Sequence, residues 1–546
     1  MRNQLGQSVI DFLRSSNVVR LNSILLVLLT AFAPAASQAF GQSAQSQLPL
    51  GTLSLLEAAR YALINSPQLH LQQQQVEIYR GQEQQAAGLF DLVLSGSYQQ
   101  GYTNDPLNYL QQLTASQSGI LARNQGTNLA TYSVNGQELF RNGIEISPVI
   151  QGSRTLDNLS NLNGVNRSSS DFNISIPLLR NRGRAVVDAQ EQAARLQVNA
   201  GLFDVRQSIT DLLAAVASAY WQYVAARANL QVALGSEERG RTIVQNMQEL
   251  INADRTPRSE INEANANLAD RVATRILAEQ QVVQAQQALA VSMGLGVDQI
   301  PDVANPSDDL PDGPNLPTPS SDSAATKRFI QQALEHRADI KADATRINAA
   351  QVQRAAAVNQ LKPLLNLTFT TGASGLAEGT SALRLLESPV HSVRGLDVIG
   401  GINFSITPAN NVAKGQVAQA TATIHQAELT QTQAKINIAS AVVVALNGLL
   451  HARQSLDESR DSVAAFQQSL QDQRDKLRLG IGSVVDLLTV EDRLTSSLTT
   501  KVQAQLNYAL ALTQLRQATG TVIDANQQSL TVDRDVFFTV PFDGRP

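Results

Sequence analysis

The sequence contains no cysteine and few aromatic residues, and these absences narrow the class of protein. Without cysteine the chain cannot form a disulfide, a thiolate metal site or a lipid anchor on a lipobox cysteine. Aromatic residues make up 4% and charged residues 16% of the chain, while Gln, Asn, Ser and Thr are abundant. This balance favours long helices that pack through Ala and Leu seams over one large aromatic core.

The net charge and the spacing of the reactive side chains argue against nucleic-acid binding, metal binding and catalysis. The formal net charge is −5 and there is no dense Lys/Arg run, which argues against a nucleic-acid partner. The five histidines are scattered without the spacing of metal ligands, so we expect no metal and no cofactor. No nucleophile motif precedes a plausible base. We therefore expect no catalytic residues and no enzymatic activity.

An uninterrupted apolar run is found near the N-terminus. Ile24–Leu29 follows three arginines, and Ser37-Gln38-Ala39 resembles a cleavage site, which predicts a secretory signal peptide over residues 1–39. A short membrane anchor is the alternative. No later segment reaches the roughly 20 apolar residues of a spanning helix, and the best, 441–450, lies inside a heptad region. If the protein crosses a membrane, it must do so as a closed β-barrel.

The two halves of the chain repeat one plan. An offset of 226 residues (520 minus 294) pairs Gly294 with Gly520 and Glu260 with Asp486. Together with the signal peptide and the Pro-rich stretch, the repeat divides the chain into six predicted segments. They are a signal peptide (1–39), an N-terminal extension (40–52), a first structural repeat (53–299), a Pro-rich linker (300–323), a second structural repeat (324–520) and a C-terminal tail (521–546).

Each half carries an apolar stripe that steps by three and four residues. The stripes comprise Leu212, Val216, Ala219, Tyr223, Ala226, Leu230 and Ala233, and Ile438, Val442, Ala445, Leu449, Ala452 and Leu456. Such stripes predict long helices packed side by side, and their duplication suggests a ring or a tube. Trp221 is expected to lie in such a seam. Glu237 and Ser459 are polar breaks, that is, polar residues that interrupt the apolar pattern of the two helices. They should face solvent or the tunnel lumen.

Strand-like sequence lies between the helices at residues 92–177 and 365–407. Residues 365–370 alternate apolar and polar side chains, as a wall between lipid and water requires. We expect at least two long strands in the first region and two in the second. The extra strand-like segments at residues 129–154 could add wall strands or form a side hairpin. An ordinary sheet in a soluble α+β domain is the alternative.

The segment Arg478–Leu488, closed by Gly520, resembles the C-terminal signature of TolC-like outer-membrane efflux and secretion channels. The resemblance extends from about Leu53 to Gly520. It implies a mostly α fold with a transmembrane β region: a duplicated long-helix α-barrel tunnel in the periplasm, plus an outer-membrane β-barrel completed by trimerisation. The implied partners of the homotrimer are outer-membrane lipid, a periplasmic adaptor protein and an inner-membrane transporter. With two strands from each region, three chains would close a barrel of 12 strands (three times four).

The resemblance also implies which residues act at the helix–turn–helix tips. Asp486 aligns with the first acidic position of the closed periplasmic end. Thr489 stands at the second, so further carboxylates would come from Glu491 or Asp492. Glu260 holds the acidic position of the other tip. These side chains are the expected gate, although Asp486 also fits a helix capping box with Ser483, and the two roles can coexist.

The family's polar latch between tips uses a Tyr and an Arg, where this chain has Leu477 and Gly482. Arg258 or Arg478 could take the place of that arginine. The residues expected to dock the adaptor are Gly480, Gly482, Thr256, Pro257 and Arg258.

The sequence is therefore interpreted as a passive exit duct of a tripartite efflux or type I secretion system. The alternative is a secreted or periplasmic coiled-coil scaffold or adhesin without transport.

Overall fold

The computed structural model describes residues 51–252, 258, 260–312, 316, 323–379, 381, 384, 393–479, 481–523 and 534–541. These residues belong to one compact unit, residues 48–546. The expected signal peptide (1–39) lies outside the described residues, as do Thr256, Pro257 and Gly480.

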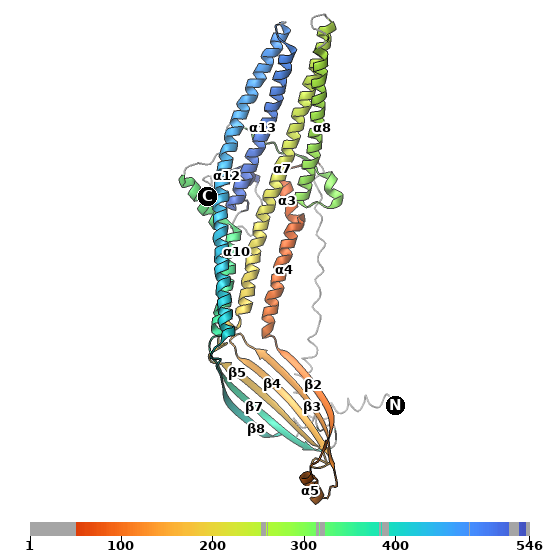
Figure 1. Ribbon diagram of the computed structural model, residues 1–546, viewed down its shortest axis with the longest axis vertical. Coiled ribbons are helices and arrows are strands. Elements are labelled where there is room, and N and C mark those ends of the chain that lie inside the picture. The colour runs from red at the N-terminus through yellow and green to blue at the C-terminus, as the bar shows by residue number, and fades with distance from the viewer. Residues whose placement is uncertain are drawn as a thin grey trace, which may run out of the picture. The chain divides into compact units, whose positions relative to one another are not determined.

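Two matching sets of helices form most of this unit. The first set is α3 (Leu55–Asn65), α4 (Pro67–Ala87), α7 (Ala189–Asn252) and α8 (Glu260–Met293). The second is α9 (Ser323–His336), α10 (Ala338–Asn359), α12 (Asn411–Arg478) and α13 (Val484–Thr519). With 64 residues, α7 is about 96 Å long at 1.5 Å per residue. Helices α7 and α8 form one long antiparallel hairpin, and α12 and α13 form the other (Figure 1).

Both stripes are largely buried already in the single chain. Val216 and Tyr223 in the first stripe, and Val442, Leu449 and Leu456 in the second, are almost fully buried. The stripes therefore pack against neighbouring helices, as expected. One helix, α12, contains an 18-residue window of mean hydropathy 1.4, so by length and composition it passes as a membrane span. Only 28% of that window is buried within the single chain; its buried part packs against α9, α10 and α13.

The polar breaks do not face solvent, so that expectation is wrong. Glu237 is 4% and Ser459 is 6% exposed. Glu237 pairs with Arg241 on its own helix and accepts a hydrogen bond from Arg275 Nε on α8 at 2.7 Å. The Ser459 hydroxyl donates to the carbonyl of Leu456 at 2.8 Å. Local partners satisfy both groups, which allows them to lie inside the seam.

The internal repeat is visible where the shorter helices end. Gly294 follows α8 with φ +73° and Gly520 follows α13 with φ +67°. In both, the next residue donates back five positions: Leu295 to Ala290 O at 3.1 Å, and Thr521 to Arg516 O at 3.0 Å. This is the Schellman arrangement, which glycine favours because it has no Cβ.

The two glycines also pack against equivalent helix starts. A Cβ on Gly294 would lie 2.8 Å from Ser66 Cα, just before α4. A Cβ on Gly520 would lie 3.3 Å from Arg337 Cα, just before α10. The same backbone contact therefore closes both halves of the chain.

Six antiparallel strands form one sheet in the order β2-β3-β4-β5-β7-β8. They are β2 (Val93–Pro106), β3 (Asn124–Leu139), β4 (Glu145–Asp157), β5 (Val165–Pro177), β7 (Leu364–Glu378) and β8 (Val393–Ser405). The first region thus contributes four strands and the second two. Of the two alternatives left open for residues 129–154, the structure has strands within the sheet and no side hairpin, since β3 and β4 pair continuously between β2 and β5.

The chain passes between helices and sheet four times, always at the same end of the strands. Helix α4 leads through η2 (Gly88–Phe90) into β2, and β5 leads through α6 (Arg184–Val187) into α7; α10 leads into β7, and β8 into α12. The far end of the sheet carries the β2–β3 connection with the short helix α5 (Tyr109–Gln117) (Figure 1). The helical tips and the α5 end are therefore at opposite ends of this unit.

Asparagines build the junction between sheet and helices. Asn181 and Asn410 are the non-glycine residues with positive φ among those described, at 61° and 38°. Asn359 Oδ1 accepts from the Asn181 backbone N–H at 2.8 Å, and Asn410 Nδ2 donates to the carbonyl of Gln360 at 3.1 Å. Arg141 braces the same region through a two-pronged bond to Glu191 on α7. Asparagine tolerates the left-handed region, so these positions turn the chain sharply.

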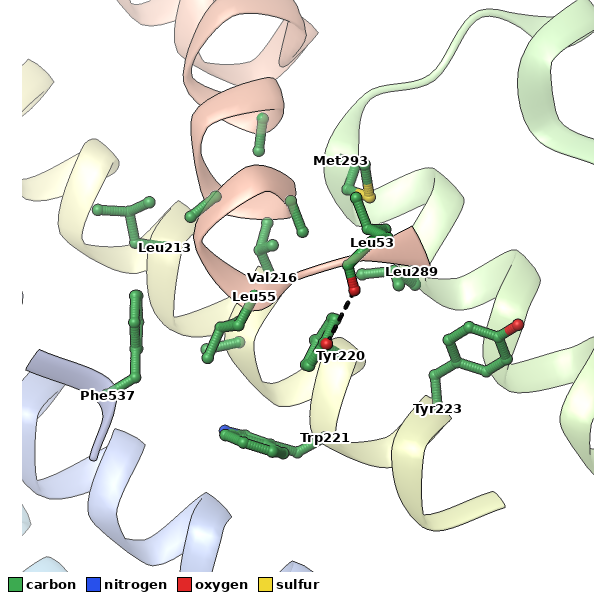
Figure 2. Close-up of a cluster of buried hydrophobic side chains, with 14 of the residues drawn as sticks. Leu53, Leu55, Leu213, Val216, Tyr220, Trp221, Tyr223, Leu289, Met293 and Phe537 are labelled. Carbon is green, nitrogen blue, oxygen red and sulfur yellow. Dashed lines mark hydrogen bonds between the residues drawn. The ribbon is translucent and has the colours of Figure 1, made fainter. Parts of the chain in front are cut away.

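The largest apolar cluster surrounds Tyr220 and Trp221 on α7 (Figure 2). Tyr220 Oη is 2.9 Å from the carbonyl of Leu53 and accepts a hydrogen bond from the backbone N–H of Asp308 at 3.1 Å. Burial raises the pKa of Tyr220 well above its usual value. Trp221 packs edge-on against Phe538 at 5.7 Å between ring centroids. The cluster joins α7 to the N-terminal segment, the linker and the C-terminal tail, and Trp221 is a seam residue as expected.

Candidate functional site

The two hairpin tips pack on each other through a small apolar cluster. It contains Ile243 and Met247 of α7, Ala264 of α8, Leu470 of α12 and Val484, Leu487, Leu488 and Leu494 of α13. All four long helices contribute, so the tips of one chain form a single packed body. Leu477, which stands at the latch Tyr position, is partly buried against this cluster.

Asp486 lies exposed in the first turn of α13. Ser483 caps the helix, because its hydroxyl accepts from the backbone N–H of Val485 at 3.1 Å. No capping box forms with Asp486, and among the described residues its carboxylate has no hydrogen-bond or ion-pair partner. Asp486 is thus favoured by the helix dipole but is free to interact outside the chain.

The other expected tip residues are less available. Thr489 donates its hydroxyl to the carbonyl of Val485 at 2.8 Å. Glu260 is the half-buried first residue of α8, and Arg258 is exposed in the adjoining turn. Arg478 is exposed and lies 3.7 Å from Asp475 on its own helix. A Cβ on Gly482 would lie 2.9 Å from the backbone nitrogen of Leu477, so glycine lets the turn fold tightly onto the end of α12.

Glu491 cannot join an acidic ring, because it is fully buried. Its carboxylate accepts from Arg239 Nε on α7 at 2.7 Å and from Arg474 Nη2 on α12 at 2.9 Å. Burying an unpaired carboxylate costs several kcal/mol, so this position requires both arginines or an equivalent partner. Glu491 therefore ties one hairpin to the other instead of facing a pore.

Asp492, the other suggested carboxylate, takes part in the same connection from the outside. Its side chain accepts from Arg271 Nη2 on α8 at 2.9 Å. Arg271 is 5% exposed and also donates to the carbonyl of Ser236 on α7 at 3.0 Å. A Cβ on Gly240 would come within 3.0 Å of Arg271 Cδ, so that glycine makes room for the arginine.

We call this group the arginine clamp. It consists of Arg239, Arg271, Arg474, Glu491 and Asp492. The arginine partners were not found from the sequence, because they lie 252, 221 and 17 residues away from their carboxylates. One signal in the sequence could have pointed to the buried carboxylate: Glu491 comes directly after the apolar Leu487, Leu488 and Val490 of a heptad region.

The sheet is the second candidate functional surface, and its two faces differ in polarity. Directly paired residues of antiparallel strands share a face. One row across all six strands is Ser97, Ser133, Gln151, Ser169, Ser374 and Gly395. The neighbouring row on the opposite face is Gly96, Val134, Ile150, Ser170, Ala373 and Leu396. A hollow of about 560 Å³ is lined by the polar row, including Ser97, Gln151 and Ser374.

The apolar face stays uncovered in the single chain. Tyr98, Ile402 and Phe404 are between 62% and 68% exposed, and Leu396 is 78% exposed. A polar hollow face and an exposed apolar face fit a wall with water on one side and lipid on the other.

The sequence profile of the outer membrane efflux protein family matches residues 150–295 and 329–521, more than half of the chain. The chain belongs to this family. Its members are channels, so the chain is an outer-membrane channel and not an enzyme, with its long helices in the periplasm. No curated protein sequence matches it.

Solved structures of outer-membrane channels share the fold. The Campylobacter jejuni CmeC channel is 14% identical, with a TM-score of 0.62 over 91% of this chain and 94% of CmeC. The VceC protein of Vibrio cholerae is 16% identical, with a TM-score of 0.60 over 85% of this chain and 96% of VceC. The Neisseria gonorrhoeae MtrE channel, solved in an open state, is 17% identical, with a TM-score of 0.57 over 85% and 88%.

Proposed function

We propose that three copies of this chain form a passive exit duct of a tripartite efflux or type I secretion system. Cargo would pass from an inner-membrane pump and a periplasmic adaptor protein through the helical tunnel and the barrel to the exterior. The observation that carries this proposal is the two-faced sheet, continuous with two long helical hairpins, in a chain of the outer membrane efflux protein family.

Unpartnered apolar residues on the helices support the trimer. On α12, Leu429, Ile436 and Val443 recur every seven residues and are 70%, 58% and 37% exposed. This stripe is separate from the buried one on the same helix. A heptad stripe is a helix-packing surface, and the neighbouring copy is the partner proposed for it.

The tips are the proposed docking and gating end. Gly480, Gly482, Thr256, Pro257 and Arg258 stay proposed contacts for the adaptor. Three copies of Asp486, with Glu260 nearby, are the proposed pore constriction, and Thr489 would border it. The free carboxylate of Asp486 supports this role, since no group within the described chain neutralises it. We assign the arginine clamp the work of holding the two tips together, in place of the latch that Leu477 and Gly482 cannot form.

The trimer is tested on the purified protein. It should leave the membrane only with detergent and migrate as a trimer that heat dissociates. Ile436→Glu should give monomers with unchanged helix content by circular dichroism, because it places a charge in the exposed stripe. Asn437→Glu, on the adjacent exposed position, is the control and should stay trimeric. A trimer unaffected by Ile436→Glu would remove this stripe from the interface.

Transport is tested in cells. Deleting the gene should stop export of the pump's cargo and restoring it should recover export, with the pump and adaptor both present. The coiled-coil scaffold or adhesin alternative requires a water-soluble protein whose loss leaves export unchanged. Extraction without detergent, together with unchanged export, would favour that alternative.

A further inference from the structure

We propose that β3 and β4 are wall strands, so that three copies close a barrel of 18 strands (three times six) through a seam between β2 of one copy and β8 of the next. This inference rests on the proposed function. Its consequence is a barrel much wider than the 12 strands that four per chain would give.

The polarity of the two central rows of the sheet continues through the inner pair. On β3 and β4, Ser133 and Gln151 continue the polar row, while Val134 and Ile150 continue the apolar row. A hairpin outside the wall would have no reason to keep one face apolar in register with its neighbours. The two inner strands therefore meet the same lipid and the same water as the outer four.

Specific packing also fixes the inner strands to their neighbours. A Cβ on Gly152 of β4 would lie 2.3 Å from the Tyr132 ring of β3, so that ring occupies the space above the glycine. In the same way the Tyr102 ring of β2 covers Gly126 of β3. Aromatic side chains over cross-strand glycines pin the register of a sheet. The strands are 13 to 16 residues long, more than the 9–11 that a membrane requires.

The free edges call for a second copy of the same chain. Strand β2 is exposed along its whole length, and β8 is the other edge of the sheet. Long unpaired edges expose backbone donors and acceptors that lipid cannot satisfy. Because six strands alternate in direction, β8 of one copy meets β2 of the next antiparallel, as the rest of the sheet does. Edges of 14 and 13 residues match in length.

The width follows from strand number. With strands about 4.8 Å apart and tilted by about 40°, 18 strands give a backbone diameter of about 36 Å and 12 strands about 24 Å. The cross-section is then about 2.3 times larger. Such a barrel leaves room for hydrated solutes or for a helical polypeptide of about 10–12 Å diameter. The barrel would not select cargo by size, and selection would fall to the helical tips.

Single-cysteine labelling tests the wall, since the chain has no cysteine of its own. Full-length trimers in outer-membrane vesicles would carry Ser133→Cys or Gln151→Cys on the polar row, and Val134→Cys or Ile150→Cys on the apolar row. A charged, membrane-impermeant maleimide should label the polar pair about tenfold faster than the apolar pair. Ser169→Cys and Phe172→Cys on β5 provide the reference pattern. The inference would be overturned if all four positions on β3 and β4 are labelled at the same rate while Ser169→Cys is still labelled faster than Phe172→Cys.

A deletion variant measures the width. Removing residues 124–157 leaves β2 antiparallel to β5, and the shortened chain should close a barrel of four strands per copy. Neutral polymers added on the extracellular side should then be excluded from the pore at about two-thirds of the full-length size limit. An unchanged size limit would overturn the inference, and if the variant does not fold, the labelling decides. Full-length protein that neither inserts nor conducts would instead refute the proposed function.

Discussion

At the scale of single residues, buried charge is the most demanding feature of this chain. Glu491 lies at the centre of the arginine clamp with no exposure to solvent, between arginines of two different helices. Its neighbour Asp492 keeps 54% of its side chain exposed. The pair offers a comparison of one buried and one exposed carboxylate in the same clamp.

Glu491→Gln should lower the stability of the folded tips by about 2 kcal/mol, because Arg239 and Arg474 lose their shared carboxylate while water reaches both only in part. Asp492→Asn should cost less, about 1 kcal/mol, because its carboxylate is 54% exposed and the buried Arg271 keeps its hydrogen bond to the Ser236 carbonyl. Thermal unfolding of the detergent-solubilised protein, followed by circular dichroism, measures both. Equal losses would mean that burial does not determine the strength of the clamp.

Gly294 combines a positive φ with a close backbone contact. Gly294→Ala should destabilise the protein by more than the roughly 1–2 kcal/mol of a left-handed alanine, because the methyl group also meets Ser66. Gly119→Ala is the matched control, since Gly119 ends α5 with φ +78° and the same Schellman bond (Ile120 N–H to Ala115 O, 2.9 Å) but has nothing near the added methyl group. The same unfolding measurement compares the two. A loss at Gly294 no greater than at Gly119 would contradict the close contact.

At the scale of elements, the linker is held by a carboxylate bridge to both helices of the second hairpin. Asp312 accepts from Arg460 Nε on α12 at 2.6 Å, and Lys501 Nζ on α13 lies at 2.8 Å. Burial by itself raises the pKa of Asp312, but the bonds from Lys501 and Arg460 outweigh it, so the pKa lies below its usual value.

A lowered pKa means that this bridge stabilises the fold above the ordinary carboxyl pKa of about 3.9. Its contribution is lost as the pH falls through the lowered value. Asp312→Asn should therefore cost about 1 kcal/mol at neutral pH and nothing in strong acid. Unfolding midpoints of both proteins across the acid range would converge if this is correct. A difference that persists at the lowest pH would assign the effect to shape instead of charge.

The sequence predicted those elements whose signal is local. The heptad stripes, the strands at residues 365–370 and 401–406 and the helix ends at Gly294 and Gly520 follow from spacing along one segment, and the structure has them there. Alternation also marked β3 and β4 as strands. It did not assign their neighbours, because strand order depends on pairing between distant segments.

The burial of polar residues in the heptad regions could not be predicted either, because it depends on partners from distant segments. Glu237 looked like a solvent-facing break because its partner Arg275 lies on the next helix, 38 residues away. Glu491 looked like a candidate for the pore, whereas Arg239 and Arg474 bury it. A carboxylate in a heptad stripe is thus ambiguous until the helix opposite is known.

At the scale of the whole molecule, the duplication governs the helices but not the sheet. Both halves end in the same Schellman turn against the same helix start, yet the first half supplies four strands and the second two. In the proposed trimer the extra pair would widen the membrane end without altering the helical tips. Barrel width and the proposed constriction at the tips would then depend on separate segments of the chain.

The last prediction concerns that constriction. If three copies of Asp486 converge near the axis, like charges about 8 Å apart in water repel by only about 0.5 kcal/mol, too little to force the tips open. The ring would instead favour cations and hold a divalent ion that blocks passage. Asp486→Asn should raise anion permeability and weaken divalent block in single-channel recordings. Asp492→Asn, six residues further along α13 and paired with Arg271, is the control and should change neither. Unchanged ion preference in Asp486→Asn would leave Asp486 with only its effect on the first turn of α13.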